Sequence, residues 1–276
     1  MAHPQFALIG HPIRKSLSDV YHNKMLDKLN IPARYGKFDI EVAQLASFLS
    51  TAKENGMLGL SVTMPLKEVI IPLLDACDES AKAIGAVNTV KFEAGKAYGF
   101  NTDAIGARKA LEEKLQGSLL EKKVVLVGAG GAAKAIAWSL MNAGAKVACT
   151  NRTYERAHML AENLGAQAFA MDVLAKQVQE ADILIQSTSV GMMDEQVILP
   201  ANLIPSHVLV FEIISQPHNG WIDALAKKGC KIVTGKDMWM RQALAQYQIW
   251  MGQDFDQKAG QKAFQEILFE SRTKPA

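Results

Sequence analysis

The sequence predicts an α/β protein with two domains, each built around a parallel sheet. Short runs of β-branched residues alternate with amphipathic stretches of helical length along almost all of its 276 residues. Such alternation is typical of parallel strands joined by crossover helices. The hydrophobic fraction of 49% and the charged fraction of 21% are those of a globular chain, so we expect packed cores rather than disorder.

The expected strands and helices follow from this alternation in chain order. Strands are predicted over residues 6–9, 58–63, 124–127, 147–150, 183–187, 208–213 and 232–234, where β-branched and other apolar residues cluster. Helices are predicted over residues 19–29, 42–54, 104–115, 132–143 and 154–164, where apolar residues recur at helical spacing. Residues 238–269 predict two further helices, separated near Gly252.

A domain boundary is expected close to residue 103. The predicted strands form one group before about residue 100 and another after residue 123, and the helical segment between the groups ends at Gly117 and Ser118. We therefore expect residues 1–103 with 237–276 to form one domain and residues 104–236 to form the other. A cleft between them is the expected location of a ligand site.

Composition excludes several classes of protein. Thirty basic and 28 acidic residues give a net charge of +2, which does not indicate a nucleic-acid or membrane surface. The three cysteines, Cys77, Cys149 and Cys230, lie far apart and indicate a reducing compartment. The N-terminal residues lack the pattern of a signal peptide, and no apolar run reaches the ~20 residues that span a bilayer. We expect a cytoplasmic protein.

Metal binding is not expected. The six histidines show neither HxH nor HxxxH spacing, and the cysteines form no CxxC pair.

A glycine-rich turn follows the strand predicted at residues 124–127. Its residues Gly128, Ala129, Gly130, Gly131, Ala132 and Ala133 fit the pattern G-x-G-x-x-G/A. A helix and the next strand complete a βαβ unit, the context in which this pattern binds a dinucleotide. The glycines let the backbone approach the pyrophosphate, and the helix N-terminus favours its negative charge. The alternative interpretation is a tight turn that binds no ligand.

The end of the second strand of this unit indicates which dinucleotide is bound. A site for NAD places an acidic residue there to bind the ribose 2′-hydroxyl. This sequence has Asn151, Arg152 and Thr153 instead, followed by Arg156. A guanidinium suits a 2′-phosphate, so the sequence favours NADP. Alternatively, Arg152 and Arg156 are only solvated side chains at the start of a helix.

Polar clusters stand at predicted strand ends in the first part of the chain. Each alone is typical of a helix cap or an Asx-turn. The clusters are Ser16 and Ser18; Ser61, Thr63 and Lys67; Asn88 and Thr89; and Asn101, Thr102 and Asp103. Lys67 stands at a helix start, where a cation is disfavoured, so a purely structural role fits it poorly.

Taken together, the motifs of this chain resemble those of the shikimate dehydrogenases. SxS at residues 16–18, VTxPxK at 62–67, GAVNT at 85–89, NTD at 101–103, GAGGA at 128–132, NRT at 151–153 and TSxGM at 188–192 occur in the order of that family. Gly235, Met238 and Gln242 match its GxxMLxxQ stretch, with Trp239 in place of leucine. The resemblance covers roughly residues 8–252. It implies an oxidoreductase that reduces 3-dehydroshikimate to shikimate with NADPH, on the way to chorismate and the aromatic amino acids.

The resemblance also implies a role for each matching residue. Lys67 and Asp103 form the catalytic pair, with Lys67 as acid/base and Asp103 orienting it or sharing its proton. The substrate is bound by Ser16, Ser18, Thr63, Asn88, Asp103 and Gln242, with Ser215 at a further substrate position. NADP is bound by Gly128, Ala129, Gly130, Gly131, Ala132, Asn151, Arg152, Thr153 and Arg156. Thr188 is a further cofactor-binding residue, and the nicotinamide end of the cleft is lined by Glu79, Ile213, Gly235 and Met238.

Three positions depart from the family pattern. Ser61 replaces an asparagine, Ser215 replaces a tyrosine that contacts substrate, and Glu212 replaces an aspartate. The reaction class is unaffected, but affinity and substrate identity are left open. A quinate/shikimate dehydrogenase or a paralogue for another cyclic polyol is therefore an alternative, although Arg152 argues against an NAD-preferring quinate enzyme.

A nucleotide-binding regulatory protein without catalysis is a further alternative. The presence of both Lys67 and Asp103 argues against it. The sequence leaves the choice between a monomer and a homodimer open.

Overall fold

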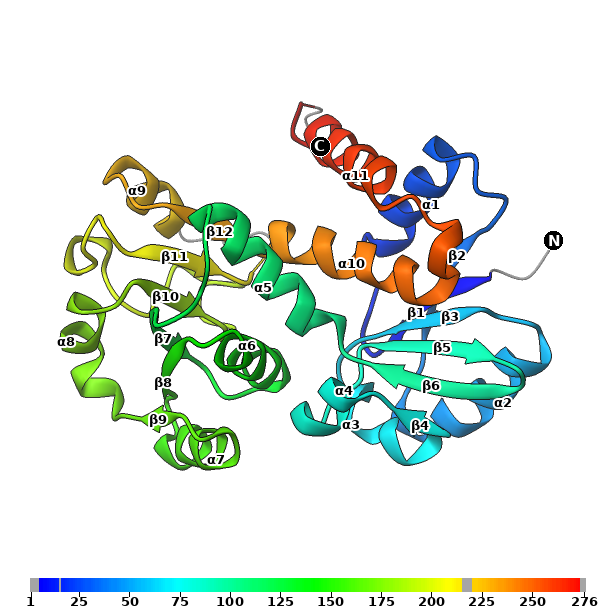
Figure 1. Ribbon diagram of the computed structural model, residues 1–276, viewed down its shortest axis with the longest axis horizontal. Coiled ribbons are helices and arrows are strands. Elements are labelled where there is room, and N and C mark those ends of the chain that lie inside the picture. The colour runs from blue at the N-terminus through cyan, green and yellow to red at the C-terminus, as the bar shows by residue number, and fades with distance from the viewer. Residues whose placement is uncertain (1–4, 15, 215–219, 274–276) are drawn as a thin grey trace. The chain divides into compact units, whose positions relative to one another are not determined.

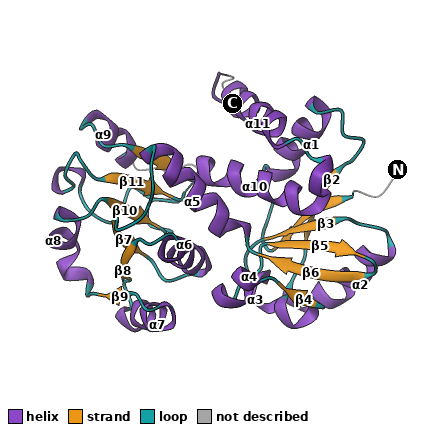
Figure 2. Cartoon of the chain, in the orientation of Figure 1, coloured by secondary structure: helices purple, strands orange, loops and turns teal. Residues whose placement is uncertain are grey.

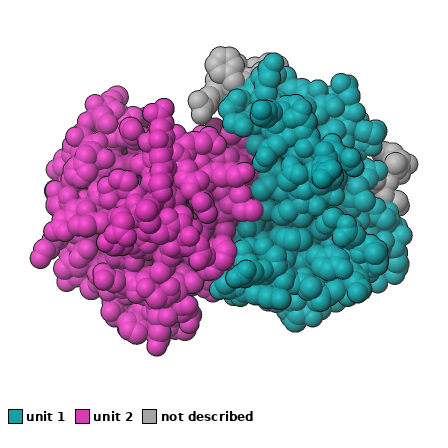
Figure 3. All heavy atoms as spheres, in the orientation of Figure 1, with its two compact units in different colours: residues 1–102, 243–276 teal, residues 103–242 magenta. Residues whose placement is uncertain are grey.

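The computed structural model describes residues 5–14, 16–214 and 220–273, with side chains up to residue 268 (Figure 1). The chain divides into two compact units, Met1–Thr102 with Ala243–Ala276 and Asp103–Gln242 (Figure 3). Unit 1 denotes the first and unit 2 the second. The domain limits expected at residues 103 and 237 stay a prediction. Among the described residues, no helix is both long and apolar enough to span a membrane.

Unit 1 is an α/β unit with one six-stranded sheet (Figure 2). Its strands are β1 (Phe6–Gly10), β2 (Tyr35–Asp39), β3 (Gly59–Val62), β4 (Ala76–Cys77), β5 (Thr89–Glu93) and β6 (Lys96–Phe100). Its helices are α1 (Ser18–Lys28), α2 (Leu45–Glu54), α3 (Leu66–Val69), α4 (Glu79–Ile84) and α11 (Gln257–Thr273), together with the second half of α10 (Gly235–Met251).

The sheet of unit 1 has the strand order β2-β1-β3-β5-β6-β4. β1 pairs in parallel with β2 and β3, and β4 pairs in parallel with β6. The sheet is mixed rather than purely parallel, because β5 runs antiparallel to both β3 and β6. A short turn joins β5 to β6, and a turn of that length connects only antiparallel neighbours.

The two faces of this sheet bury different side chains, as the period of two along a strand requires. Ala7 and Ile9 of β1 belong to the aliphatic cluster that includes Leu45 and Leu49 of α2. Phe6, on the other face of β1, stacks on Trp250 at a centroid distance of 4.8 Å. The amphipathic pattern predicted for residues 42–54 therefore forms a core helix.

Unit 2 contains a six-stranded sheet in the order β12-β11-β10-β7-β8-β9, with every pair parallel. Its strands are β7 (Lys123–Val127), β8 (Lys146–Thr150), β9 (Gln167–Ala168), β10 (Ile183–Gln186), β11 (Leu209–Glu212) and β12 (Ile232–Thr234). Its helices are α5 (Thr102–Leu115), α6 (Gly131–Asn142), α7 (Tyr154–Leu164), α8 (Leu174–Gln179), α9 (Trp221–Lys227) and the first half of α10. This is the doubly wound, Rossmann-type strand order.

Both faces of this second sheet are covered, as a parallel sheet requires. Val124 and Leu126 of β7 lie in one apolar cluster with Ile136 of α6, whereas Val125 and Val127 lie in another with Trp221 of α9. The predicted α/β fold class is confirmed in both units.

Candidate functional site

Polar side chains gather at one edge of the sheet of unit 1. β1, β2, β3 and β6 run in the same direction, so their carboxyl ends meet there, and antiparallel β5 begins there. Thr63 follows β3, Asn88 precedes β5 and Thr102 follows β6. The edge is tied together by Val62 N–H donating to Asn88 O at 2.8 Å and Asn88 N–H donating to Phe100 O at 3.1 Å. Segments far apart in sequence thus meet at the predicted substrate positions.

Asn88 is the buried centre of this edge, with 3% of its surface exposed. Its Oδ1 accepts from the backbone N–H of Thr102 at 2.7 Å, and its Nδ2 donates to Thr102 Oγ1 at 3.0 Å. On the other side, Val87 N–H donates to the backbone oxygen of Lys67 at 2.8 Å. These bonds fix the backbone at Lys67, whose side chain is half-buried, and at Thr102, which directly precedes the buried Asp103. Asn88 therefore holds in place the backbone next to both predicted catalytic residues.

The SxS turn contains a pair of hydroxyls that bond to each other just before the helix α1. Leu17 is the N-cap residue of α1 and makes no side-chain capping bond. Ser16 Oγ instead donates to Ser18 Oγ at 3.0 Å, and both residues are half-buried. Ser16 Oγ also accepts from the backbone N–H of Ser18, the first residue of α1, at 3.3 Å, so this hydroxyl contacts the helix start as well as the partner hydroxyl. The two hydroxyls remain candidates for ligand binding.

Ser61, one of the three departures from the family pattern, belongs to a buried chain of hydrogen bonds. Its Oγ accepts from Tyr35 Oη at 2.6 Å and donates to Gln246 Oε1 at 2.9 Å. Gln246 Nε2 then donates to Thr89 Oγ1 at 3.0 Å, and Thr89 Oγ1 donates to Asn88 Oδ1 at 2.8 Å. Neither Tyr35 nor Gln246 stands in a motif that identifies it from the sequence alone. Serine at position 61 thus links β2 and α10 to the predicted substrate residue Asn88.

Ser61→Ala is expected to lower the free energy of unfolding by about 2–4 kcal/mol. The change leaves Tyr35 Oη and Gln246 Oε1 buried without their partner, at about 1–3 kcal/mol for each unpaired group. Urea denaturation measures the loss. The double variant Ser61→Ala with Tyr35→Phe should lose less than the sum of its single variants, because it removes both ends of one bond. A change below about 0.5 kcal/mol for Ser61→Ala would contradict the proposed chain of bonds.

The glycine-rich turn of unit 2 has the shape that a dinucleotide pyrophosphate needs. Gly128 has φ +124°, and a Cβ added there would overlap Ser187 Oγ, so only glycine fits. A Cβ added at Gly130 or Gly131 would meet no atom within 4 Å, so space is open at the N-terminus of α6. Ala129 is buried and Ala132 half-buried. The predicted turn residues therefore fit NADP, whose pyrophosphate needs a close backbone approach at this helix terminus.

The predicted 2′-phosphate residues follow β8, the strand next to β7 in this sheet. Thr153 is the N-cap residue of α7, and Asn151 Nδ2 donates to its backbone oxygen at 3.0 Å. Arg152 and Arg156 are exposed. Arg152 thus follows the carboxyl end of β8, where this fold binds the adenosine ribose, and Arg156 lies in the first turn of α7.

The TSxGM turn after β10 is shaped by a glutamine that the sequence analysis missed. Gln186 is 1% exposed, and its Oε1 accepts from Thr188 N and Thr188 Oγ1, both at 2.9 Å. Its Nε2 donates to Val190 O at 2.9 Å, and its backbone oxygen accepts from Ile213 N at 3.1 Å. Two predicted cofactor-binding residues, Thr188 and Ile213, are therefore brought together around Gln186.

Helices α5 and α10 approach closely within unit 2. A Cβ added at Gly106 of α5 would lie 2.9 Å from Gln242 Cβ and 2.7 Å from Met238 O of α10. Asp103 precedes Gly106 by about one turn of helix and therefore lies on the same side of α5. Met238 packs in the apolar core. At the start of α10, a Cβ added at Gly235 would overlap Ile213 O.

Two predicted site residues gain no support from these contacts. Glu79 is exposed in the first turn of α4, after the capping residue Asp78. Ser215 lies outside the described residues, so its predicted role at the substrate position stays a prediction.

Glu212, at the carboxyl end of β11, is a buried acid with an unusual environment. It is 1% exposed, and its Oε1 accepts from Ile214 N at 2.8 Å. Oε2 is buried and has no hydrogen-bond partner among the described residues. Burial raises the pKa of Glu212 from 4.5 to about 7, against the opposing effect of the Ile214 N–H.

Glu212→Gln is expected to make the stability less dependent on pH. The pKa of Glu212 is higher in the folded than in the unfolded state. The contribution of this proton to stability is therefore complete below about pH 4.5 and is lost as the pH rises through about 7. The wild-type protein should therefore lose about 2–3 kcal/mol of unfolding free energy relative to the variant between pH 4.5 and pH 8. Urea denaturation at several pH values measures this. Equal pH dependence in both proteins would show that folding does not raise the pKa of Glu212.

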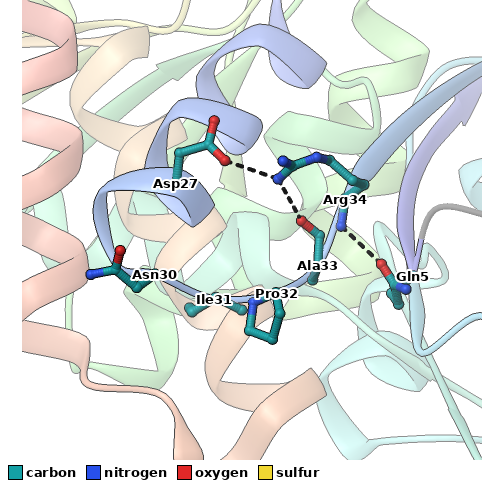
Figure 4. A pocket seen from close by; sticks show the side chains of 7 residues that line it. All are labelled: Gln5, Asp27, Asn30, Ile31, Pro32, Ala33 and Arg34. Carbon is teal, nitrogen blue, oxygen red and sulfur yellow. Dashed lines mark hydrogen bonds and ion pairs between the residues drawn. The ribbon is translucent and has the colours of Figure 1, made fainter. Parts of the chain in front are cut away.

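Two cavities lie away from these polar edges. One, of about 460 Å³, is lined by Gln5 and by residues 27 and 30–34, at the amino ends of β1 and β2 (Figure 4). Arg34 in this cavity is already paired with Asp27 at 2.9 Å. The other, of about 550 Å³, opens at the amino ends of β7 and β8. Ligands of parallel sheets bind at carboxyl ends, so neither cavity fits the predicted site.

Comparisons with known proteins find the same family in both parts of the sequence. Residues 8–90 match the family described as shikimate dehydrogenase substrate binding domain, and residues 109–203 match shikimate / quinate 5-dehydrogenase. A shikimate dehydrogenase (NADP(+)) of Pyrococcus furiosus is 38% identical over 252 residues, which cover 91% of each chain.

Solved structures of this family share the fold. The crystal structure of shikimate dehydrogenase from Aquifex aeolicus has a TM-score of 0.85 at 35% identity, covering 94% of this chain and 96% of that one. The enzyme of Thermus thermophilus, solved in complex with NADP(H) and shikimate, has a TM-score of 0.84 at 34% identity, covering 95% and 98%.

Proposed function

This chain belongs to the shikimate dehydrogenase family, as its ordered motifs predict, and we propose that it interconverts 3-dehydroshikimate and shikimate with NADP(H). Such an enzyme is an oxidoreductase acting on a CH–OH group. The observation that supports the proposal is the set of bonds at residues 87 and 88, because it ties the backbone of Val62, Lys67 and Thr102 to one polar edge of unit 1. Arg152, after β8, supports NADP rather than NAD.

The proposed mechanism assigns the binding of substrate and the movement of the proton to residues of this chain. The hydroxyls of Ser16, Ser18 and Thr63 and the amides of Asn88 and Gln242 bind the polar groups of the ring. Lys67 donates a proton to the carbonyl oxygen in reduction and accepts it in the reverse direction, with Asp103 orienting the amine. Rigid hydrogen bonding of Asn88 keeps these groups aligned without reorganisation during the reaction.

The cofactor is assigned to the loops at the carboxyl ends of the strands of unit 2. When bound, NADPH supplies the hydride to the carbonyl carbon. Gly128, Gly130 and Gly131 would hold the pyrophosphate, and Arg152 with Arg156 would hold the 2′-phosphate. The turn shaped by Gln186 would position Thr188 beside the nicotinamide, with Ile213, Gly235 and Met238.

Substrate comparison tests the proposal against its nearest alternative. Initial rates of oxidation by the purified chain are measured with NADP for shikimate and for quinate, which carries an extra hydroxyl and a saturated ring. We expect kcat/KM for shikimate to exceed that for quinate by at least about tenfold, since an unmatched buried polar group costs about 1–3 kcal/mol. A preference for quinate would favour the quinate dehydrogenase alternative. Turnover of neither compound would favour another cyclic polyol.

The cellular location and the oligomeric state of the protein are also proposed. The free cysteines Cys77, Cys149 and Cys230 support a reducing, cytoplasmic location. The proposed partners are the substrate and NADP, and the protein is proposed to be a monomer or a homodimer.

A further inference from the structure

A lysine and an aspartate bracket the turn that carries Ser16 and Ser18. Lys37 Nζ donates to the backbone oxygen of Ser16 at 2.8 Å and lies 3.3 Å from Asp19 Oδ1. The two charged side chains are 25% and 29% exposed, so solvent screens them only in part. A positive and a negative charge thus lie next to the hydroxyl pair, and neither has a place in the mechanism above.

The position of Lys37 follows from the geometry of β2. Tyr35 and Lys37 are two residues apart on this edge strand, so their side chains lie on the same face. Asn23 of α1 accepts from Tyr35 N–H at 3.0 Å and donates to Tyr35 O at 2.9 Å, which joins the helix to the strand edge. Tyr35 is further held by its bond to Ser61. The backbone at Lys37 is therefore held in place, and its side chain extends to the Ser16–Ser18 turn.

The charges of this pair matter because the proposed substrate is an anion. Shikimate has one ionised group, its carboxylate, and hydroxyl pairs are suitable donors to carboxylates. With both charges present, the pair is neutral overall. Without the ammonium, Asp19 would be an unpaired carboxylate beside the carboxylate of the substrate, and such like-charge juxtaposition is strongly unfavourable in a partly buried site.

We propose that Lys37 and Asp19 set the charge of the subsite that binds the substrate carboxylate at the Ser16–Ser18 turn. Lys37 supplies positive potential to the turn, and Asp19 limits that potential. This inference rests on the proposed function. It makes the pair a determinant of specificity for anionic over neutral ring substrates.

The test compares shikimate with its uncharged methyl ester in four proteins: wild type, Lys37→Met, Asp19→Asn and the double variant. For shikimate, Lys37→Met should lower kcat/KM about 10–100-fold, mainly through KM, and the double variant should recover most of this loss. Asp19→Asn should keep or raise kcat/KM. For the methyl ester, all variants should stay within about threefold of the wild type, because no charge is present to be repelled.

Salt and a matched lysine provide the controls. The loss in Lys37→Met should shrink at about 1 M salt, where charges are screened beyond about 3 Å. Lys53→Met removes a lysine of similar exposure, 30%, that pairs with Asp75 at 3.4 Å, and it should leave the ratio of the two substrates unchanged. Lys37→Arg should preserve the preference for shikimate.

Each outcome distinguishes this inference from the proposed function. Equal losses for shikimate and its ester in Lys37→Met, insensitive to salt, would mean that Lys37 is only structural and would overturn the inference alone. If Lys37→Met does not fold, Asp19→Asn decides: a fall in kcat/KM specific to shikimate overturns the inference. Absence of shikimate turnover by the wild type would overturn the proposed function, and the inference with it.

Discussion

Lys67→Ala is expected to lower kcat by about 10²–10⁴-fold while NADPH binding stays nearly unchanged. Lys67 is half-buried on α3 of unit 1, whereas the predicted cofactor residues other than Glu79 belong to unit 2. The alanine variant loses the group that donates the proton to the substrate oxygen, so the chemical step slows. Initial rates at saturating substrate measure kcat, and the fluorescence of bound NADPH measures its affinity.

Two variants separate proton transfer from charge and from folding. Lys67→Arg keeps a cation, but a guanidinium does not release its proton, so this variant should remain almost as slow as the alanine variant. Lys82→Ala, at an exposed lysine of α4 in the same unit, should behave like the wild type. Unchanged turnover in Lys67→Ala would contradict the mechanism directly.

Arg152→Asp is expected to reverse the choice of cofactor. The variant loses a charge-assisted contact to the 2′-phosphate and places a carboxylate against it, so kcat/KM for NADP should fall about 10²–10³-fold. The value for NAD should change by less than about threefold or rise, because aspartate can bind the ribose 2′-hydroxyl. Parallel initial rates with the two cofactors at fixed shikimate concentration give the ratio.

Lys146→Asp is the matched control for this prediction. Lys146 begins the strand that Arg152 follows, so the same reversal of charge is made at the opposite end of β8. It pairs with Glu121, so its substitution also removes an ion pair. The control should not alter the ratio of NADP to NAD. Equal losses for both cofactors in Arg152→Asp would show that the arginine is structural.

The long, strongly patterned elements were predictable from the sequence. The segment from β7 through α6 to β8 carries an apolar strand, a glycine turn and a helix in the order that one fold requires, and the structure confirms it. The pair of helices α10 and α11, separated near Gly252, is confirmed as well. In these segments local preference and tertiary packing agree.

The elements that the sequence analysis missed carry weak local signals. β2 lies at the edge of the sheet, where polar side chains are tolerated. Its Lys37 pairs with Asp19 of α1 and its Asp39 pairs with His11, so the strand lacks an apolar pattern. The β5–β6 hairpin turns at Ala94 and Gly95, with φ 51° and 75°. Alanine is unusual at such a position, so the turn lacks the Asn-Gly or Asp-Gly signal that predicts a hairpin.

The residues of the candidate site were also predictable only where they belong to contiguous motifs. Contiguous motifs identified Lys67, Asn88, Asp103 and the glycine turn, whose predicted roles remain to be tested. The chain of hydrogen bonds that reaches Asn88 was not predictable, because its members meet only after folding. Ser61 is 26 residues from Tyr35 and 185 from Gln246. A buried polar residue in a helix, such as Gln246, was the one available signal, since such groups require partners.

The most direct test of the central claim is reduction of 3-dehydroshikimate by NADPH with the product identified. The purified chain is mixed with both compounds, the loss of reduced nicotinamide is followed by absorbance, and the product is separated and identified. We predict one shikimate formed for each NADPH consumed, at a rate far above that with NADH. NADPH binding without any consumption in the presence of 3-dehydroshikimate would contradict the proposed function.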